Sequence, residues 1–132
     1  AIAFDIDRFK SINDTYGHII GDFVLQEVAN ILKNCIRADN DWVARYGGDE
    51  FLVCLNNVDH DEAYQVAERI RISIERNSIP IQDENIRFTI SLGVYTTQGA
   101  TLTAEEIISC ADRKLYEAKK SGRNCTVAGG AN

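Results

Sequence analysis

Apolar and polar residues alternate over the first segment of the chain, residues 1–7 (AIAFDID). A period of two predicts a β-strand, and the less apolar face of this strand carries Asp5 and Asp7. The next stretch, RFKSIND, favours a short helix, and Gly17 is placed to end it. Apolar residues then recur at helical spacing over about residues 19–37, which predicts a longer helix.

Two apolar runs, about residues 42–46 and 51–55, flank a turn with the sequence GGDE. Apolar runs around a turn that contains glycine predict a β-hairpin. Helical spacing predicts a third helix over about residues 60–76. Alternation returns over residues 86–95, which predicts a strand, and a short strand around residues 79–81 is expected to pair with its start.

The C-terminal part begins with TAEE at residues 103–106, a capping-box pattern that opens a fourth helix, and Gly122 closes it. A last short strand is expected over residues 125–127, and the final AGGAN is expected to be a frayed tail. The order βααββαβαβ is typical of an α+β sandwich, ferredoxin-like, with a mainly antiparallel central sheet and helices packed around it. In such a sheet the first strand commonly lies beside the hairpin, which would bring Asp5 close to the acidic turn.

The chain has 132 residues, 45% of them apolar, as expected for one globular domain. It carries 14 basic and 20 acidic residues, a net charge of −6, which argues against a general binder of nucleic acid or of anionic membranes. No apolar run approaches the ~20 residues of a membrane helix. The cysteines form no Cys-x-x-Cys pair and are interpreted as buried, reduced thiols of a cytosolic protein. They are Cys35, Cys54, Cys110 and Cys125.

Asp5, Asp49 and Glu50 are expected at one edge of the sheet, where they would repel one another unless a cation neutralises them. Carboxylate oxygens without His or Cys nearby select a hard ion, Mg²⁺ or Mn²⁺, over Zn²⁺. Mg²⁺ is usually held by one or two carboxylates plus phosphate oxygens, so a phosphorylated ligand is expected too. The alternative, a solvated acidic turn, would explain GGDE alone, whereas the Asp-x-Asp strand favours the metal.

Asp7 is interpreted as the N-cap of the short helix, with a place in the metal shell as the alternative. The start of that helix, residues 8–10 (RFK), would offer free amides and a cation to phosphate oxygens. Lys119 and Arg123 add two cations near the end of the fourth helix, where ordinary favourable charge is the simpler explanation. By default, the remaining polar candidates are interpreted as helix-end residues: Asn13, His18 and Asp22.

Several separated segments resemble, in the right order, the GGDEF domain of diguanylate cyclases: FDIDRFKSINDTYGHIIGD, RYGGDEF, TISLGV and ADRKLYEAKKSGRN. The resemblance covers nearly the whole chain and implies a palm-like fold, similar to that of adenylyl cyclases and some polymerases. It implies that two GTP molecules are condensed into cyclic di-GMP with release of two pyrophosphates. Because one such domain binds one GTP, it also implies a homodimer with the active site at the interface. Sensory or receiver domains are expected in the full-length protein.

The resemblance also assigns roles by position. The residues that would bind the metal (Mg²⁺ or Mn²⁺) are Asp5, Ile6 through its carbonyl, Asp49 and Glu50. The catalytic carboxylates would be Asp49 and Glu50. Nucleotide contacts fall to Asn13, His18 and Asp22. Positions near the phosphates are Phe9, Lys10, Lys119 and Arg123. GTP is expected over ATP, because Asp22 can accept hydrogen bonds from guanine N1–H and N2–H₂, a pairing that adenine lacks.

The chain departs from the family pattern just before the hairpin, where many members carry an Arg-x-x-Asp product-inhibition site. Asp41 stands at the acidic position, Ala38 takes the place of the arginine, and Arg37 lies one residue early. Product is therefore expected to bind weakly here. The chain contains no methionine and starts within a predicted strand, so residues 1–132 are interpreted as a single GGDEF domain from a longer protein, without the usual N-terminal helix.

An active diguanylate cyclase in the cytoplasm is the leading hypothesis. Whether the full-length protein is attached to a membrane is left open. The domain itself is expected to contact neither nucleic acid nor membrane. The main alternative is a catalytically silent GTP-binding module that regulates a partner, but such modules typically lose hairpin acids, and the hairpin here is intact. A third alternative, an interaction domain with an acidic loop, leaves Asp5, Asn13 and Asp22 unexplained.

Overall fold

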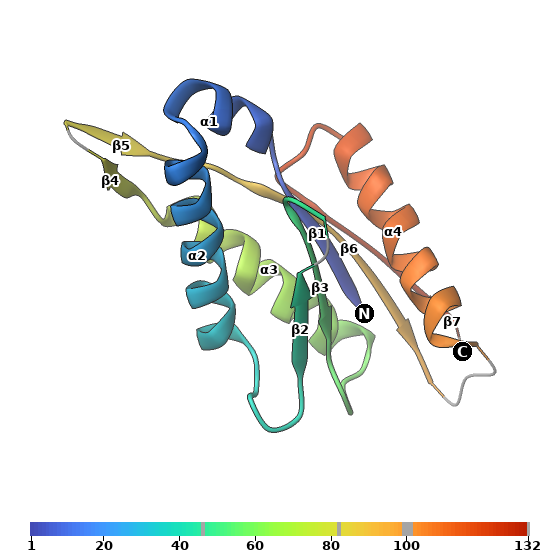
Figure 1. The fold of residues 1–132 in the computed structure, drawn as a ribbon. Coiled ribbons are helices and arrows are strands. Elements are labelled where there is room, and N and C mark those ends of the chain that lie inside the picture. The colour runs from blue at the N-terminus through green and yellow to red at the C-terminus, as the bar shows by residue number, and fades with distance from the viewer. Residues whose placement is uncertain (46, 82, 99–101, 132) are drawn as a thin grey trace.

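The computed structural model describes residues 1–45, 47–81, 83–98 and 102–131, and Figure 1 shows how their helices and strands are arranged. The strands are β1 (Ile2–Ile6), β2 (Trp42–Arg45), β3 (Glu50–Cys54), β4 (Ile79–Ile81), β5 (Glu84–Ile86), β6 (Ile90–Thr97) and β7 (Thr126–Ala131). The helices are α1 (Phe9–Tyr16), α2 (His18–Cys35), α3 (His60–Arg76) and α4 (Ala104–Lys120). No helix within the described ranges is long and apolar enough to cross a membrane.

The central sheet has five strands in the order β2-β3-β1-β6-β7, and β4 and β5 pair in a separate small sheet. β1 lies in the middle, antiparallel to β3 on one side and to β6 on the other. β2 is antiparallel to β3, whereas β7 runs parallel to β6. A mostly antiparallel sheet with helices around it confirms the predicted α+β class. The position of β1 next to β3 confirms that the first strand lies beside the hairpin.

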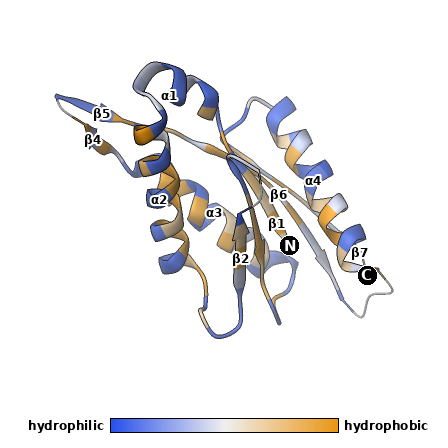
Figure 2. Cartoon of the chain, in the orientation of Figure 1, coloured by the Kyte–Doolittle hydropathy of each residue, from blue (hydrophilic) through white to orange (hydrophobic). Residues whose placement is uncertain are grey.

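β1 alternates between two hydrophobic layers. Ile2 and Phe4 are fully buried among apolar residues of α2 and α3. These two helices lie on one face of the sheet (Figure 1), and both carry hydrophobic positions (Figure 2). Ala3 points to the opposite face, where it packs with Leu115 of α4. Because side chains alternate along a strand, Asp5 lies on the same face as Ala3. The alternation therefore turns a carboxylate toward α4.

The register between β1 and β3 is held by a pair of aromatic rings. Phe4 is the register partner of Phe51, and their rings stack with centroids 4.9 Å apart and an interplanar angle of 5°. Such a pair contributes ~0.5–1.5 kcal/mol beyond the burial of its surface. A slip of one residue would turn the apolar face of β1 toward the wrong layer. The hydrophobic packing thus also determines which residue stands opposite Asp5.

Gly93 of β6 lets α4 lie directly on the sheet. A Cβ at this position would be 2.1 Å from the backbone nitrogen of Leu115 and 2.2 Å from the carbonyl oxygen of Ala111. Backbone atoms cannot rotate out of the way, so the contact requires glycine. This close approach brings the last turns of α4 near β1.

Three helix boundaries predicted from capping residues, at Gly17, Thr103 and Gly122, are confirmed. Gly17 follows α1 with a φ of 89°, in the left-handed region that favours glycine. Thr103 accepts a hydrogen bond from the Glu106 amide and Glu106 accepts one from the Thr103 amide, both at 3.2 Å, which completes the capping box of α4. Ser121 caps the end of α4, and Gly122 follows with a φ of 108°.

Two predicted segments differ from the structure. The strand expected over residues 86–95 is divided into β5 and β6, because β1 ends opposite Ile90 and the loop residue Thr89 turns to bond Asp7. The expected frayed tail instead extends β7 as far as Ala131, because the backbone of β6 offers it a parallel partner. Two parts of these predictions, Tyr46 in the hairpin and Asn132 in the tail, lie outside the described residues.

All four cysteines are free, and only one of them is buried. Cys35 is buried in α2, in agreement with the prediction, whereas Cys54, Cys110 and Cys125 are half-buried. Burial raises the pKa of the Cys54 and Cys125 thiols, which keeps them protonated and weakly reactive near neutral pH.

Candidate active site

The acidic residues of β1 and of the hairpin meet across the β1–β3 pair. Asp5 is the register partner of Glu50, the first residue of β3. The amide of Ile6 donates a 3.3 Å hydrogen bond to the carbonyl of Asp49, so the residue before β3 also lies beside the end of β1. The structure therefore brings together the four residues to which a metal was assigned. Their roles as metal ligands stay predictions.

Asp5 is a buried carboxylate with one of its oxygens unused. Only 6% of the residue is exposed, and its Oδ2 accepts a hydrogen bond from the ammonium of Lys119. Its Oδ1 is buried and has no hydrogen-bond partner in the part of the chain that the structure describes. Burial raises the pKa of Asp5; Lys119 opposes this rise, and the nearby Asp49 and Asp112 add to it. A cation bound at Oδ1 would offset the cost of burying the charged carboxylate and reduce its repulsion by Asp49 and Asp112.

Glu50 shares this environment. Burial raises the pKa of Glu50, and the carboxylates of Asp5 and Asp49 raise it further. Both side chains line a hollow of about 220 Å³ between the sheet and α4, together with Ala3, Phe51, Asp112, Leu115, Tyr116 and Lys119. Asp112 escaped the sequence analysis, although it precedes Lys119 by two helical turns and so shares its face of α4.

The residues present fit a hard cation that takes only one or two of its ligands from the protein. No group of three or more His, Cys, Asp or Glu side chains within the described ranges forms a ready-made metal centre. Mg²⁺ needs no such centre, because it is typically held by one or two carboxylates with water and phosphate completing the shell. The unused oxygen of Asp5 and the adjacent Glu50 supply that number of oxygen donors. Among the described residues that line the hollow there is no His or Cys side chain, which fits Mg²⁺ or Mn²⁺ better than Zn²⁺.

Asp7 does not cap α1, so that interpretation was wrong. The N-cap residue is Arg8, with a φ of 56° and no side-chain capping bond. The carboxylate of Asp7 instead accepts hydrogen bonds from Thr89 Oγ1 at 2.7 Å, Ser91 Oγ at 2.6 Å and the Asn124 amide at 3.1 Å. These donors come from the strand and loop that pack against the end of β1, and they compete successfully with the amides of α1.

Asn13 lies against a glycine on the next helix. A Cβ at Gly21 of α2 would stand 1.8 Å from Asn13 Oδ1, so only glycine leaves room for this amide. Asn13 Oδ1 is buried without a hydrogen-bond partner among the described residues. A buried, unpaired polar atom is costly, and a ligand that donates a hydrogen bond would remove the cost. His18 and Asp22 are exposed on the first turns of α2, open to a ligand.

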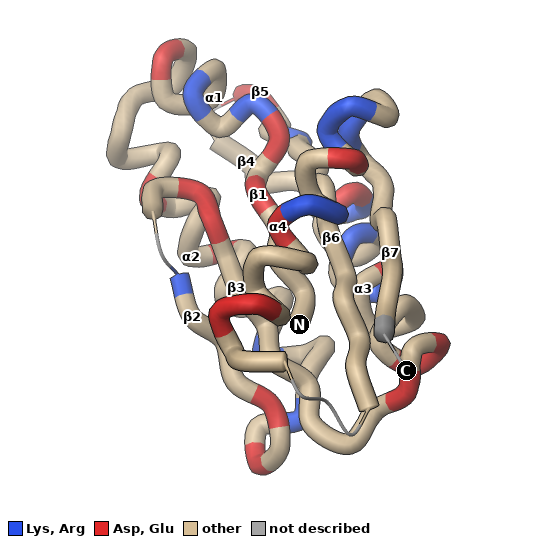
Figure 3. The backbone as a smooth tube through the Cα atoms, turned by 90° about the vertical axis from the view of Figure 1, so that its right-hand side faces the viewer, with Lys and Arg blue, Asp and Glu red and all other residues tan. Residues whose placement is uncertain are grey.

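The four residues expected near the phosphates divide into two groups. On α1, Lys10 is exposed and Phe9 is half-buried against the hydrophobic core. At the other side, Lys119 lies on the last turns of α4 and Arg123 is exposed in the loop that follows. Figure 3 shows basic positions of α4 next to acidic positions of β1. The ion pair of Lys119 with Asp5 shows that this lysine does more than complete a helix end.

Asp41 is buried and fully engaged within the chain. It accepts hydrogen bonds from the Arg37 amide at 2.9 Å, from the Arg37 guanidinium at 3.1 and 3.3 Å, and from the Asn56 amide at 3.2 Å. Burial opposes ionisation of Asp41, but these bonds outweigh it and hold its pKa below the ordinary value. Ala38 is exposed nearby. Arg37 therefore supports the loop before β2, and weak product binding at this position stays a prediction.

The family model described as "Diguanylate cyclase, GGDEF domain" matches residues 1–125. Among curated proteins, Diguanylate cyclase A of Treponema denticola is 51% identical over 123 residues, which cover 93% of this chain and 33% of the relative. The response regulator PleD of Caulobacter vibrioides is 43% identical over 129 residues, which cover 96% of this chain and 28% of the relative. The chain thus spans a third or less of the length of these two relatives.

Solved structures agree with the sequence match. The diguanylate cyclase SiaD of Pseudomonas aeruginosa, solved with its activator SiaC, superposes with a TM-score of 0.89 at 35% identity, covering 97% of this chain and 48% of SiaD. The GGDEF domain of DgcB from Caulobacter crescentus, solved with c-di-GMP, gives a TM-score of 0.88 at 29% identity, covering 96% of this chain and 75% of that one. The family match over most of the chain and the shared fold lead to one conclusion: this chain is a GGDEF domain and belongs to the diguanylate cyclase family.

Proposed function

We propose that this domain binds GTP and acts as one half of a diguanylate cyclase, which joins two GTP molecules into cyclic di-GMP and releases two pyrophosphates. The observation that carries the proposal is the meeting of Asp5 and Glu50 across β1 and β3, with an Asp5 oxygen that no described protein group bonds. Lys119 lies within hydrogen-bond reach of the same carboxylate. Acids and a cation are thus gathered where a metal–triphosphate ligand would find partners of both signs.

The acids at the start of β3 would serve the chemistry directly. Asp5, the Ile6 carbonyl, Asp49 and Glu50 would hold Mg²⁺ or Mn²⁺, which when bound lowers the pKa of the attacking 3′-hydroxyl and offsets charge on the leaving pyrophosphate. Asp49 or Glu50 would accept the proton of that hydroxyl, a contribution of ~10²–10⁴ in rate. Metal binding and proton transfer compete for the oxygens of Asp49.

The helical side of the site would select guanine. Asn13 presents a buried oxygen without a described partner, and Asp22 is exposed on the neighbouring helix. Guanine N1–H and N2–H₂ can donate to these acceptors, whereas adenine would leave a desolvated carboxylate unmatched at a cost of ~1–3 kcal/mol. Lys10, Lys119 and Arg123 would meet the phosphates. GTP is therefore the proposed substrate in preference to ATP.

The product requires two such domains. Each 3′-hydroxyl must reach the α-phosphorus of the other nucleotide, and one domain binds a single GTP in this scheme. The proposed active species is therefore a homodimer with its two nucleotide sites face to face. Its activity should rise more steeply than linearly with protein concentration as long as the domain is mostly monomeric.

The direct test is to incubate concentrated protein with GTP and Mg²⁺ and to detect cyclic di-GMP by mass. Asp49→Ala should abolish product, and Asp83→Ala, an exposed aspartate on the β4–β5 turn, should not. Equal product from wild type and Asp49→Ala would refute the assigned chemistry. GTP binding without product in the wild type would instead favour the catalytically silent regulatory module.

A second test addresses the metal without relying on turnover. The melting temperature of the wild type should rise when Mg²⁺ and GTP are added together, and Asp5→Asn should lose most of that rise. Asn keeps the shape of the side chain but cannot supply a negative charge. An Asp5→Asn protein that responds to Mg²⁺ and GTP as the wild type does would show that the metal is held elsewhere.

A further inference from the structure

The loop after α4 holds an unusual backbone conformation at the place where the phosphates of GTP are proposed to bind. Gly122, Arg123 and Asn124 follow one another with positive φ values of 108°, 65° and 46°. Glycine adopts this region freely, but for arginine the left-handed conformation costs free energy and needs support from elsewhere. The amide of Arg123 itself donates a 3.1 Å hydrogen bond to the carbonyl of Ala118, and the neighbouring Asn124 adds further contacts.

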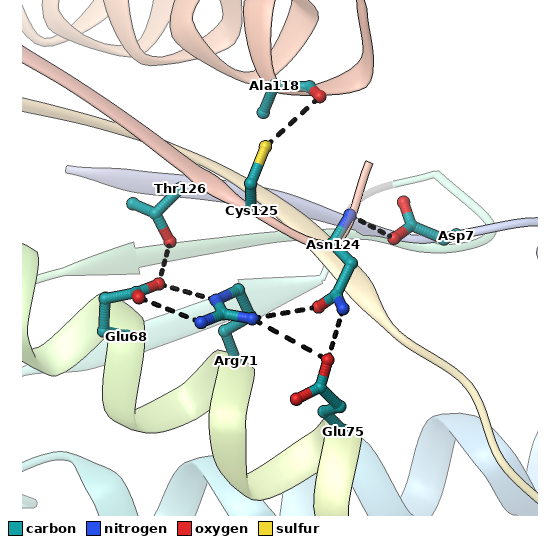
Figure 4. A network of polar contacts seen from close by, with 8 residues as sticks. All are labelled: Asp7, Glu68, Arg71, Glu75, Ala118, Asn124, Cys125 and Thr126. Atoms are coloured by element: carbon teal, nitrogen blue, oxygen red, sulfur yellow. Dashed lines mark hydrogen bonds and ion pairs between the residues drawn. The ribbon is translucent and has the colours of Figure 1, made fainter. Parts of the chain in front are cut away.

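Asn124 supplies these contacts through its backbone and both ends of its amide (Figure 4). Its backbone amide donates to Asp7 Oδ2 at 3.1 Å, and its side-chain nitrogen donates to Glu75 at the end of α3. Its side-chain oxygen accepts a 3.1 Å hydrogen bond from Arg71, one turn earlier on α3. Asn124 thus links the loop after α4 to α3 and to Asp7, the residue that follows β1.

Arg71 is itself held in place. It forms a bidentate pair with Glu68, with bonds of 2.7 and 3.0 Å, and Thr126 of β7 donates to Glu68 at 2.9 Å. The Arg71 hydrogen bond holds the pKa of Glu68 below its ordinary value, so the pair stays charged near neutral pH. Bidentate pairs of this kind are rigid in direction as well as strong. Asn124 therefore binds to a fixed guanidinium.

The contact with Asp7 joins this network to the metal and phosphate side of the site. Asp7 follows Ile6 directly and precedes Arg8, the N-cap of α1. Its other bonds, to Thr89 and Ser91, fix it to the β6 side of the sheet. The loop that carries Arg123 and the start of α1 are thereby fixed relative to each other.

We propose that Asn124 is a positioning residue that, clamped by Arg71 and Glu75, orients Arg123 toward the phosphates of GTP. The inference rests on the proposed function, because it assumes that Arg123 meets those phosphates. Asn124 acts through its neighbour and touches no reacting atom. Preorganisation of this kind lowers the ordering cost of binding, so loosening the clamp weakens the ligand even though Arg123 is still present.

The test is a double-mutant cycle on GTP affinity, measured by calorimetry with Mg²⁺. Asn124→Gly removes the side-chain contacts and accepts a φ of 46° without strain. We expect it to weaken GTP binding about tenfold, as does the loss of one charge-assisted hydrogen bond. In the Arg123→Ala background the same change should have less than about a twofold effect, because the group it positions is gone.

Replacing Glu75 removes one of the two contacts that hold the Asn124 side chain against α3, and is a milder change than Asn124→Gly. Its side chain is 44% exposed, so replacing it leaves the core intact. Glu75→Ala should weaken GTP binding in the same direction as Asn124→Gly, and Glu75→Gln, which keeps an acceptor for the Asn124 amide, should restore it. Arg76→Ala, an exposed change on the next residue of α3 and outside the clamp, is the matched control.

Inorganic triphosphate, which lacks the guanine, is the probe for the phosphate part. Weaker triphosphate binding by Asn124→Gly, at an unchanged melting temperature, would support the positioning role. Equal effects of Asn124→Gly with and without Arg123, or a loss of GTP affinity with triphosphate binding untouched, would overturn it. A failure of the proposed cyclase activity would be detected in a different assay, as the absence of cyclic di-GMP from wild-type reactions.

Discussion

Replacing Gly21 by alanine tests how closely α1 and α2 enclose Asn13. The new methyl group would stand 1.8 Å from Asn13 Oδ1 and 2.9 Å from its Cγ, both far inside van der Waals contact. The backbone of Gly21 is ordinary α-helix, so alanine brings no conformational strain of its own. The whole effect of the substitution should therefore pass through Asn13.

The magnitude follows from two opposing contributions. Alanine in place of a helical glycine stabilises a protein by ~0.5–1 kcal/mol. Forcing an extra methyl group into a packed contact costs ~1–3 kcal/mol. In the wild-type background the two nearly cancel or leave a net loss, because Asn13 must rotate its amide away. In an Asn13→Ala background the clashing atoms are absent, and only the gain of ~0.5–1 kcal/mol remains.

Urea unfolding of four proteins measures this coupling: wild type, Gly21→Ala, Asn13→Ala and the double variant. We expect the effect of Gly21→Ala to differ between the two backgrounds by ~1–3 kcal/mol, the cost of the clash. Gly21→Ala should also weaken GTP binding about as much as Asn13→Ala does, and the two losses should not add. Equal stabilisation by Gly21→Ala in both backgrounds would refute the contact and with it the placement of Asn13.

The remaining predictions concern the packing of α4, the loop before β2 and the response to product. Gly93→Ala should lower the free energy of unfolding by about 3 kcal/mol or more in urea, because its Cβ would meet backbone atoms; wild-type stability would contradict the close approach of α4. Asp41→Asn should cost ~1–3 kcal/mol at neutral pH. Because the pKa of Asp41 lies below its ordinary value, this contribution is present above the ordinary pKa and lost as the pH falls through the lowered one. Unfolding curves of Asp41→Asn and wild type should therefore converge in acid, and a constant difference would exclude the ion pair as its source. Calorimetry should find only weak binding of cyclic di-GMP near Asp41; tight binding that Arg37→Ala abolishes would show that Arg37 replaces the missing arginine.

The elements of this fold could be predicted because local signals and tertiary packing agree. The alternation of β1, the glycine that ends α1 and the capping box of α4 each appear where the sequence placed them. The meeting of Asp5 with the hairpin acids was also predictable, because the order of elements constrains which strands are neighbours.

Other features depend on contacts that no local pattern contains. The glycine-rich tail pairs with β6 only because that strand has a free edge, and glycine is a poor predictor of strands. Asp7 had the sequence context of an N-cap, but Thr89 and Ser91, distant in sequence, offer it hydroxyl donors. Asp112 and Asn124 carry no signal beyond their place in a helix and a loop. Asp112 lies near Asp5 of β1, and Asn124 bonds to Arg71 and Glu75 of α3; only the folded chain brings these elements together.

The central position of β1 also shapes the way the domain folds. Its partners β3 and β6 lie far along the chain, so the entropy of closing long loops must be overcome before this strand gains any hydrogen bond. We expect the helical pair α1–α2 to form early. Until β3 and β6 pair with it, the apolar β1 is exposed and can associate with other chains. The acids of the site meet only when the sheet closes. No smaller folded fragment should retain the metal and nucleotide affinities, which appear together with the last cooperative step of folding.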